Sequence, residues 1–269
     1  MVRVGLAGAA LLLVGGAVLG CGTGDGGPGG GPGGGPGHAR TSQVEGITAV
    51  RLLPGAGGVS IRREPGGTGR VEQRVRIWDG SDARTDKLYH RVEGGTLVLD
   101  TECGQNCSVD FTVSLPDQVP VDGDLGAGSL DATDVASVRV GVGSGDIAAR
   151  HVPGPVEVRT GAGGITLDDV GGKVSAETGS GEVEGRDLRG GEVVATTSAG
   201  DIALHLIAPQ SVQAESGTGG IDLTVPQGTY RVETDTGVGE AEIDVAQDPA
   251  SPRLLKLSTG TGSIRVHAG

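Results

Sequence analysis

Large aromatic side chains are nearly missing from this chain of 269 residues, which has four of them and a single methionine. The four are Trp78, Tyr89, Phe111 and Tyr230. This scarcity excludes a conventional globular core packed around aromatic rings. Basic residues are also in the minority, with 21 against 34 acidic residues and a formal net charge of −13. Because nucleic-acid binding relies on basic patches and stacking rings, the composition argues against it.

Long hydrophobic runs are confined to the beginning of the chain. Residues 4–20 are uncharged, follow Arg3 and number 17, which is short of the roughly 20 that a membrane-spanning helix needs. The pattern predicts a signal peptide over residues 1–20. The run ends in Val18-Leu19-Gly20-Cys21, which resembles the lipobox of bacterial lipoproteins, in which the cysteine thiol accepts a diacylglycerol. An ordinary signal peptide with a chance cysteine is the alternative.

Glycine, in contrast, is abundant, with 54 residues. Residues 22–37 contain 11 glycines and 3 prolines in a period of four, so they do not have the collagen period of three. With no apolar side chain to bury, this segment is expected to be a disordered tether, and we assign residues 21–42 to the lipidated cysteine and tether. Removal of residues 1–20 takes away only Arg3, which leaves a mature charge of 20 − 34 = −14.

A short glycine signature recurs along the second half of the chain, for example GSGDI (143–147), GAGGI (161–165) and GTGSI (260–264). Eight copies place a glycine at the predicted turn, namely Gly128, Gly145, Gly163, Gly181, Gly200, Gly219, Gly239 and Gly262. Their successive spacings are 17, 18, 18, 19, 19, 20 and 23 residues. Glycine at a corner supplies positive φ without a Cβ clash, so we predict a turn at each copy.

Apolar and polar residues alternate on both sides of these turns, as in Val156/Val158 before Gly163 and Ile165/Leu167 after it. This period of two predicts strands with one buried face, and two short strands with two turns fit the spacing. One such rung cannot bury its own apolar face, so rungs must stack. The sequence therefore predicts an all-β, single-stranded parallel β-solenoid with rungs of roughly 18–20 residues, glycine-rich turns and almost no helix. An immunoglobulin-like sandwich is the alternative.

The repeats divide the folded part into two segments. Residues 119–269 are expected to form the regular rungs, and residues 43–118 a broader, irregular start of the same solenoid. The strands expected in this irregular segment are 44–53, 58–63, 70–78, 86–93, 96–101 and 108–115. The last repeat, at 263–267, runs almost to the final residue, so the edge of the last strand is expected to be exposed or paired with a partner.

The lipobox, the tether and the rung signature together resemble a bacterial cell-envelope family, variously called the putative adhesin, β-strand-repeat or toast-rack domain. The element around Cys103-Gly104-Gln105-Asn106-Cys107 looks like a variant seen in actinobacterial lipoproteins. The resemblance covers roughly residues 45–269 and implies an exported β-solenoid without a known catalytic residue.

Cys103 and Cys107 are the only cysteines besides Cys21. In an exported protein this spacing favours a local disulfide that pins a short loop. Free thiols and a metal site are the alternatives, and the metal site is disfavoured because no histidine lies nearby in sequence.

A calcium ladder is a second hypothesis to weigh, since two nonapeptide repeats also span 18 residues. The residue after the turn glycine varies, however, and includes Ser129, Asp146 and Gly164. Asp222 and Asp244 are expected on adjacent rungs, facing outward, and a solvated face is the better interpretation of both. We therefore predict no metal site and no cofactor.

Catalytic motifs are absent from the sequence: neither G-x-S-x-G nor H-E-x-x-H occurs, and the five histidines are scattered. His205 and His267 are expected to point outward. The sequence predicts a non-catalytic, lipid-anchored protein on the outer face of the bacterial cell membrane with a structural, adhesin-like or interaction role. An envelope-stress sensing or regulatory module is the alternative, and a polysaccharide-active enzyme is third.

The expected partners are the membrane, through the N-terminal lipid, and a cell-wall component or protein. The mature charge disfavours close contact with anionic lipids or wall polymers and favours a basic partner. We predict no nucleic-acid partner, and the sequence shows no small-molecule substrate.

Overall fold

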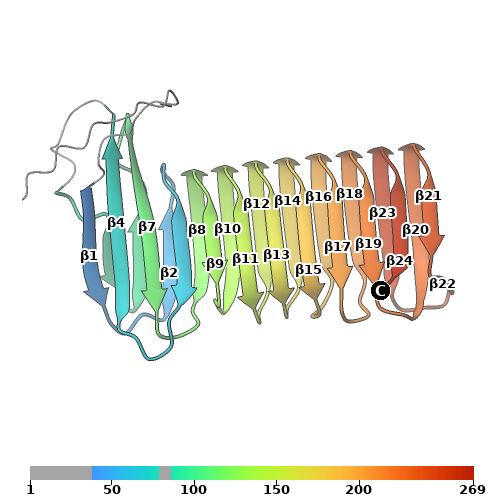
Figure 1. The fold of residues 1–269 in the computed structure, drawn as a ribbon, viewed down its shortest axis with the longest axis horizontal. Coiled ribbons are helices and arrows are strands. Elements are labelled where there is room, and N and C mark those ends of the chain that lie inside the picture. Colours follow the sequence, from blue (N-terminus) through green and yellow to red (C-terminus); the bar gives the residue numbers. More distant parts are fainter. Residues whose placement is uncertain (1–37, 79–85) are drawn as a thin grey trace, which may run out of the picture. The chain divides into compact units, whose positions relative to one another are not determined.

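A computed structural model describes residues 38–78 and 86–269. All regular elements in these residues are β-strands, which form two sheets of twelve strands each (Figure 1). The all-β prediction is confirmed, and none of these residues belongs to a helix capable of crossing a bilayer. The predicted signal peptide (1–20), Cys21 and most of the tether lie outside the described residues.

The two sheets are named A and B here, and their strands follow in spatial order. Sheet A consists of β1 (His38–Val44), β4 (Gly69–Ile77), β7 (Cys107–Leu115), β3 (Val59–Arg63), β9 (Leu130–Thr133), β11 (Ile147–Val152), β13 (Ile165–Val170), β15 (Val183–Leu188), β17 (Ile202–Leu206), β19 (Ile221–Val225), β24 (Ile264–Ala268) and β21 (Ala241–Asp244). Sheet B consists of β22 (Ala246–Gln247), β20 (Thr229–Val238), β23 (Leu254–Thr261), β18 (Val212–Thr218), β16 (Val193–Ala199), β14 (Val174–Ser180), β12 (Val156–Ala162), β10 (Ser137–Ser144), β8 (Pro120–Ala127), β2 (Ala49–Leu53), β6 (Thr96–Asp100) and β5 (His90–Glu93).

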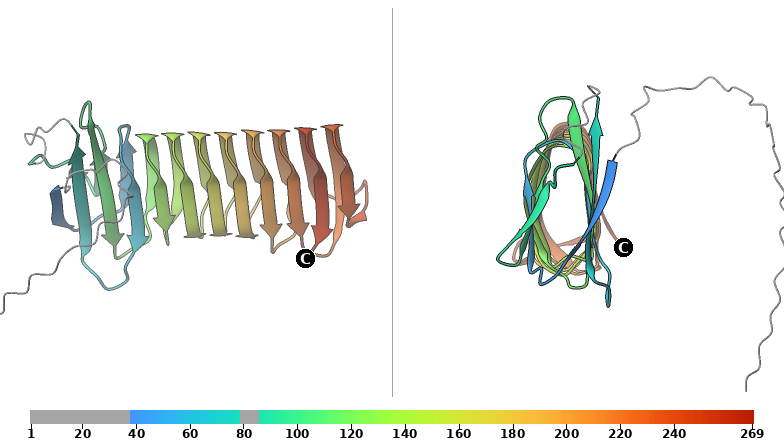
Figure 2. Two further views of the ribbon diagram at one scale, coloured as in Figure 1. Left: turned by 45° about the horizontal axis from the view of Figure 1, so that its top comes forward. Right: turned by 90° about the vertical axis from the view of Figure 1, so that its left-hand side faces the viewer.

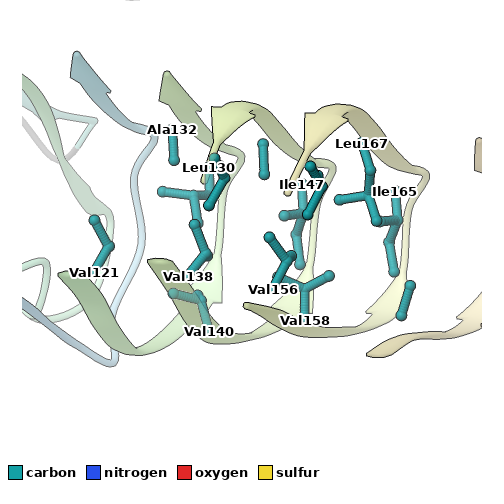
Figure 3. Close-up of a cluster of buried hydrophobic side chains, with 14 of the residues drawn as sticks. Val121, Leu130, Ala132, Val138, Val140, Ile147, Val156, Val158, Ile165 and Leu167 are labelled. Carbon is teal, nitrogen blue, oxygen red and sulfur yellow. The ribbon is translucent and has the colours of Figure 1, made fainter. Parts of the chain in front are cut away.

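Each regular rung contributes one strand to each sheet, as the repeat predicts. In the rung of β12 and β13, Val156 lies in register with Val138 and Val174 of the neighbouring rungs. The same residue types therefore stack in columns, and the two sheets face each other with their apolar columns between them (Figures 2 and 3). These inward side chains, such as Val156 and Ile165, are 1% exposed. Small and β-branched residues fill the narrow interior, which explains the scarcity of aromatic rings.

A column of buried hydroxyl groups runs beside the glycine turns. Thr178 Oγ1 donates a hydrogen bond of 2.9 Å to the Gly163 carbonyl of the preceding rung. Four other rungs repeat this bond between an inward hydroxyl and the preceding turn glycine, through Thr160, Thr197, Ser216 and Thr259. The hydroxyl residue stands three positions before the turn glycine of its own rung, a regularity of the sequence that the glycine spacing alone does not reveal. Each bond satisfies a carbonyl at a corner where no other strand group reaches it.

The irregular N-terminal segment differs from the prediction in two places. The single strand expected over 44–53 is two strands, β1 and β2, which lie in different sheets because the chain turns at Gly46, where φ is 66°. In addition, β1 takes in residues 38–42, assigned above to the tether, because β1 pairs along its whole length with β4. The other domain boundaries stay predictions.

Rungs at this end are also out of sequence order. The rung of β2 and β3 lies between the rung of β6 and β7 and that of β8 and β9, with parallel pairing on both sides. Beyond them, β4 and β1 extend sheet A and β5 extends sheet B, and the pairs β4–β7, β1–β4 and β5–β6 are antiparallel. Antiparallel strands therefore replace rungs at the N-terminal end (Figure 1).

A buried glutamine holds a segment across this end of the interior. Gln73 is 0% exposed, and its amide group donates to the Lys87 carbonyl at 2.7 Å and accepts from the Tyr89 amide at 2.9 Å. Tyr89 is itself 2% exposed. Because Gln73 projects inward from β4, the two bonds fix residues 86–90 over the end of the apolar columns. The N-terminal end of the solenoid is therefore closed.

The C-terminal end corrects the expectation about the last strand. The final strand, β24, is not at an edge: it pairs with β19 on one side and with β21 on the other. Its partner in the rung, β23, likewise lies between β18 and β20. The outermost rung consists of β20 and β21. The strands β23 and β24, which follow them in sequence, form the rung inside it. The alternating pattern specifies each rung but not the order in which rungs stack, which is why the prediction from sequence was wrong here.

Candidate interaction surfaces

The predicted cysteine pair forms a disulfide, with Cα atoms 5.9 Å apart. Cys103 lies in the connection from β6 to β7 and Cys107 is the first residue of β7, at the corner where other rungs have a glycine turn. Both side chains are buried, with 9% and 4% exposed. The bridge therefore shapes the corner of the rung nearest the closed end. The predicted lipidation residue, Cys21, lies outside the described part of the chain.

The eight predicted turn glycines form one column along the solenoid. Their φ angles lie between 135° and 151°. At Gly163 a Cβ atom would come within 2.2 Å of the Gly145 carbonyl oxygen of the preceding rung. The Gly163 amide in turn donates to the Ser180 carbonyl of the next rung at 2.8 Å. Positive φ and the close approach of neighbouring rungs both require glycine, so this column has a structural role.

Charged side chains form rows across the outer face of sheet B. Outward positions of consecutive rungs are in register, so Asp122, Arg139 and Glu157 are neighbours in one row. Arg139 Nε donates to Glu157 Oε2 at 3.0 Å, and this hydrogen bond raises the pKa of Arg139 above its usual value. Both side chains are well exposed, at 70% and 61%. Such exposed pairs stabilise the fold little, so their charges and hydrogen-bonding groups are accessible to a partner.

One of these rows has a glycine, Gly141, between Asp124 and Arg159. Arg159 extends over this glycine and its guanidinium lies 3.3 Å from Asp124 Oδ1. A Cβ atom at Gly141 would lie 2.5 Å from that same carboxylate oxygen, so the pairing needs glycine there. The adjoining depression has a volume of about 250 Å³ and is lined by both charge pairs and by Glu177. It is open and polar, and offers alternating cationic and anionic groups to a surface ligand.

The outer face of sheet A carries the two outward histidines. His205 Nδ1 lies 3.3 Å from Asp187 Oδ1, and His267 Nδ1 lies 3.8 Å from Asp222 Oδ1. Thr224 Oγ1 is 2.8 Å from the other ring nitrogen of His267. Both histidine side chains point outward, as expected, with 43% and 46% exposed. Each imidazole is thus paired with one carboxylate on its own part of the surface.

The expected neighbourhood of Asp222 and Asp244 is wrong. Asp222 is in register with Arg265, and Arg265 is in register with Glu242, while Asp244 lies beside His267 in the second row. The inserted last rung separates the two rungs and places Arg265 between Asp222 and Glu242, while Asp244 stands in the row of Thr224. Within residues 38–78 and 86–269, no group of three or more histidine, cysteine, aspartate or glutamate residues could hold a metal ion.

A second corner column was not predicted from the sequence. Asp134, His151, Asp169 and Asp187 all have left-handed backbone conformations, with φ between 53° and 57°. Aspartate tolerates this conformation better than most residues do. In the sequence this column is visible as an aspartate or histidine before an apolar residue, at spacings of 17, 18 and 18 residues. This column is therefore a turn element and not a ligand set.

Comparisons with known proteins agree with this architecture. The family model described as Toastrack DUF4097 matches residues 87–268, more than half of the chain. A putative adhesin from Parabacteroides merdae ATCC 43184 has a similar solved structure, with a TM-score of 0.50 and 11% identity over 86% of this chain and 96% of that one. This likeness shows a shared fold alone.

Two further solved structures are similar. A putative adhesin from Bacteroides fragilis NCTC 9343 has a TM-score of 0.48 and 18% identity, over 85% of this chain and 95% of that one. A putative lipid binding protein from Parabacteroides distasonis ATCC 8503 has a TM-score of 0.47 and 15% identity, over 85% and 96%. No curated protein matches the sequence. On the extent of the family match, this chain belongs to the toastrack family DUF4097.

Proposed function

We propose that this protein is a non-catalytic, lipid-anchored β-solenoid on the outer face of a bacterial membrane, where it binds another envelope molecule through its ordered surfaces. The observation that carries the proposal is the set of exposed, in-register charged rows on the outer face of sheet B. Rows held at the spacing of stacked strands present charge at fixed intervals, which suits recognition of an extended or repeating partner.

The position of the chain's first strand supports the anchoring part of the proposal. β1 begins at His38 and lies at the closed end of the solenoid. A lipid on Cys21 followed by the expected tether would hold that end toward the membrane, with a root-mean-square reach of about 20 Å. The outer faces and the opposite end would then be available to partners.

The arrangement of polar groups supports a non-catalytic role. In the described residues, the two arginine–carboxylate pairs of sheet B line one open depression, while the arginine–carboxylate pair and the two histidine–carboxylate pairs of sheet A lie elsewhere on the surface. Catalysis usually needs several such groups around one reacting atom, in a site that excludes water. Binding through dispersed exposed charges needs no such convergence.

Anchoring is tested by replacing Cys21 with serine in the full chain, expressed in a bacterium with lipoprotein processing. The unchanged chain is expected in the membrane fraction, accessible to protease added to intact cells. Cys21→Ser should accumulate as an unprocessed or unlipidated form. Equal processing and equal lipid labelling of the two chains would contradict the proposal.

The interaction role is tested with residues 22–269, which are the mature chain without its lipidated cysteine, and isolated envelopes of the source bacterium. Saturable binding is expected, and Arg139→Glu with Arg159→Glu should weaken it about tenfold, equivalent to about 1.4 kcal/mol. The matched control is Arg150→Glu with Arg186→Glu, which changes charge equally on sheet A. No saturable binding, or equal loss with both pairs, would count against the surface on sheet B.

A further inference from the structure

In the described chain, most of the outer edge of the outermost rung has no neighbouring strand. β20 is covered only at Thr229 and Tyr230, which pair with β22, and β21 pairs only with β24. Among the strands that the structure describes, none lies beyond residues 231–238 or 241–244 (Figures 1 and 2). We call residues 231–244 the open rung.

Backbone groups of the open rung point outward, away from the stack. The Arg231 amide donates to the Arg253 carbonyl, so residues alternating with Arg231 direct their N–H and C=O groups to the other side. These are Val232, Thr234 and Thr236 in β20. By the same alternation from Glu240, whose carbonyl accepts from Ile264, they are Ala241 and Ile243 in β21. The open rung therefore presents an unused hydrogen-bonding edge in both sheets.

The same residues carry the inward side chains, and these lack the cover found elsewhere. Val232 and Ile243 are half-buried, whereas their register neighbours Leu255 and Val266 are 0% and 1% exposed. A depression of about 370 Å³ lies at the corner beside Ile243. Val238, at 68%, has the largest exposed fraction among the large hydrophobic residues of the described chain. One more strand would bury this apolar surface.

The charge of the open rung determines which kind of added strand it attracts. Residues 229–248 contain six acidic residues and one basic residue, a net charge of 1 − 6 = −5. Glu233, Asp235 and Glu242 stand at outward positions, where they would lie beside the outward side chains of an added strand. A second copy meeting this end with its own open rung would place acid against acid, which is unfavourable. Lysine or arginine at those positions would be attracted.

We infer that the open rung binds an extended basic segment of a protein partner by strand addition. The segment joins β20 as an edge strand, with small apolar residues over Val232 and Thr234 and basic residues beside Glu233 and Asp235. Main-chain hydrogen bonds supply the binding energy and the alternating side chains supply the selectivity. The inference deepens the proposed interaction role and rests on it, although strand addition itself is measurable without an envelope.

The probe is a fluorescent peptide as long as β20 that alternates valine and lysine, titrated with the mature chain and followed by fluorescence anisotropy. Saturable binding with a Kd of about 1–100 μM is expected, weakening as salt is added. Thr234→Pro removes an amide that points to the open side and not into the stack, so the fold should survive and binding should weaken at least tenfold. A peptide with its valines and lysines in two blocks should not bind.

The charge contribution is measured with the variant Asp235→Lys/Glu242→Lys. This variant also tests the inference if Thr234→Pro does not fold. Its matched control, Glu182→Lys/Glu215→Lys, changes exposed residues of interior rungs and should bind like the unchanged chain. Binding weaker than about 1 mM, equal binding of the blocked peptide, or equal loss in the control would overturn the inference. So would self-association through this edge, detected by sedimentation of the protein alone and removed by the edge variants. Envelope binding that persists without peptide binding would overturn strand addition and leave the broader role standing.

Discussion

The two ends of the solenoid solve the same problem in different ways. A stack of rungs exposes its apolar columns at each end, and the N-terminal end covers them with antiparallel strands and the segment held by Gln73. The C-terminal end has no such cover in the described chain. Instead, the open rung has a polar residue in the apolar column: Thr234 stands at the position that Leu257 and Ala214 occupy in the two rungs beneath it. The two ends also differ in charge: residues 38–78 carry 7 − 3 = +4, and residues 229–248 carry 1 − 6 = −5.

The comparison suggests different tasks for the two ends. At the N-terminal end the sheets still finish in the edge strands β1 and β5, but the apolar columns are covered, while the acidic open edge at the other end resists self-association and stays available to a partner. The rung of β23 and β24 is inserted inside the open rung, so β24 has a neighbouring strand on both sides. The rung of β2 and β3 is likewise inserted, since β2 lies between β6 and β8.

The largest expected effect compares one turn in the middle of the stack with the same turn at the open end. Gly163→Val requires an unfavourable φ and a Cβ within 2.2 Å of a backbone oxygen, between two fixed rungs. We expect it to lower the free energy of unfolding by more than about 4 kcal/mol. Gly239→Val meets a similar clash in a rung that can move outward, so the loss should be less than half as large. Denaturant unfolding measures both, and equal losses would contradict the special freedom of the open rung.

A second comparison uses one column position in adjacent rungs. Leu257→Ala removes a side chain that is 1% exposed and should cost about 2–5 kcal/mol. Thr234→Ala, its register neighbour in the open rung, should cost less than about 0.5–1 kcal/mol because Thr234 is exposed. Urea titrations of the two variants and the unchanged chain would show this. Similar costs would mean that the open rung is as well packed as the interior.

At the closed end, Gln73→Leu removes the acceptor of the Tyr89 amide and the donor to the Lys87 carbonyl. Leaving these buried backbone groups unsatisfied should cost about 1–3 kcal/mol. The variant should also increase amide hydrogen exchange in residues 86–90 without affecting residues 229–244. Exchange in 86–90 that stays unchanged would mean that Gln73 does not hold this segment in place.

The smallest expected effect is a pH dependence confined to the closed end. Burial lowers the pKa of His90 below its usual 6.5. The unfolded chain then binds this proton more readily, so stability is unaffected above about pH 6.5 and falls as the pH decreases toward the lower folded pKa. His90→Gln should flatten this part of the stability profile between about pH 7 and 5. A profile that His90→Gln leaves unchanged would assign the slope to other groups.

The sequence was informative wherever a local rule operates. The spacing of Gly128 to Gly262 with its flanking alternation specified stacked rungs of parallel strands. The spacing of the two cysteines, together with the expectation of export, was enough to predict the disulfide. These predictions rest on residues that act within one rung or between identical neighbours.

Other features depend on which rungs meet, and the pattern contains no information about that. Nothing in the alternation of β23 and β24 distinguishes insertion inside the open rung from stacking outside it. The same ambiguity concealed that the rung of β23 and β24 separates the rung of Asp222 from that of Asp244. The Asp134 column recurs at regular spacing in the sequence, but a charged residue at such a position does not by itself indicate a left-handed corner.

The order of rungs at the open end is tested most directly by amide hydrogen exchange resolved along the chain. If β23 and β24 lie inside the open rung, residues 254–268 should exchange as slowly as the interior rungs at 193–225. Residues 231–244 should exchange fastest among the rungs, although they precede 254–268 in sequence. Exchange that is fastest in 254–268 and slower in 231–244 would contradict the inserted rung and, with it, the open edge proposed to bind a partner.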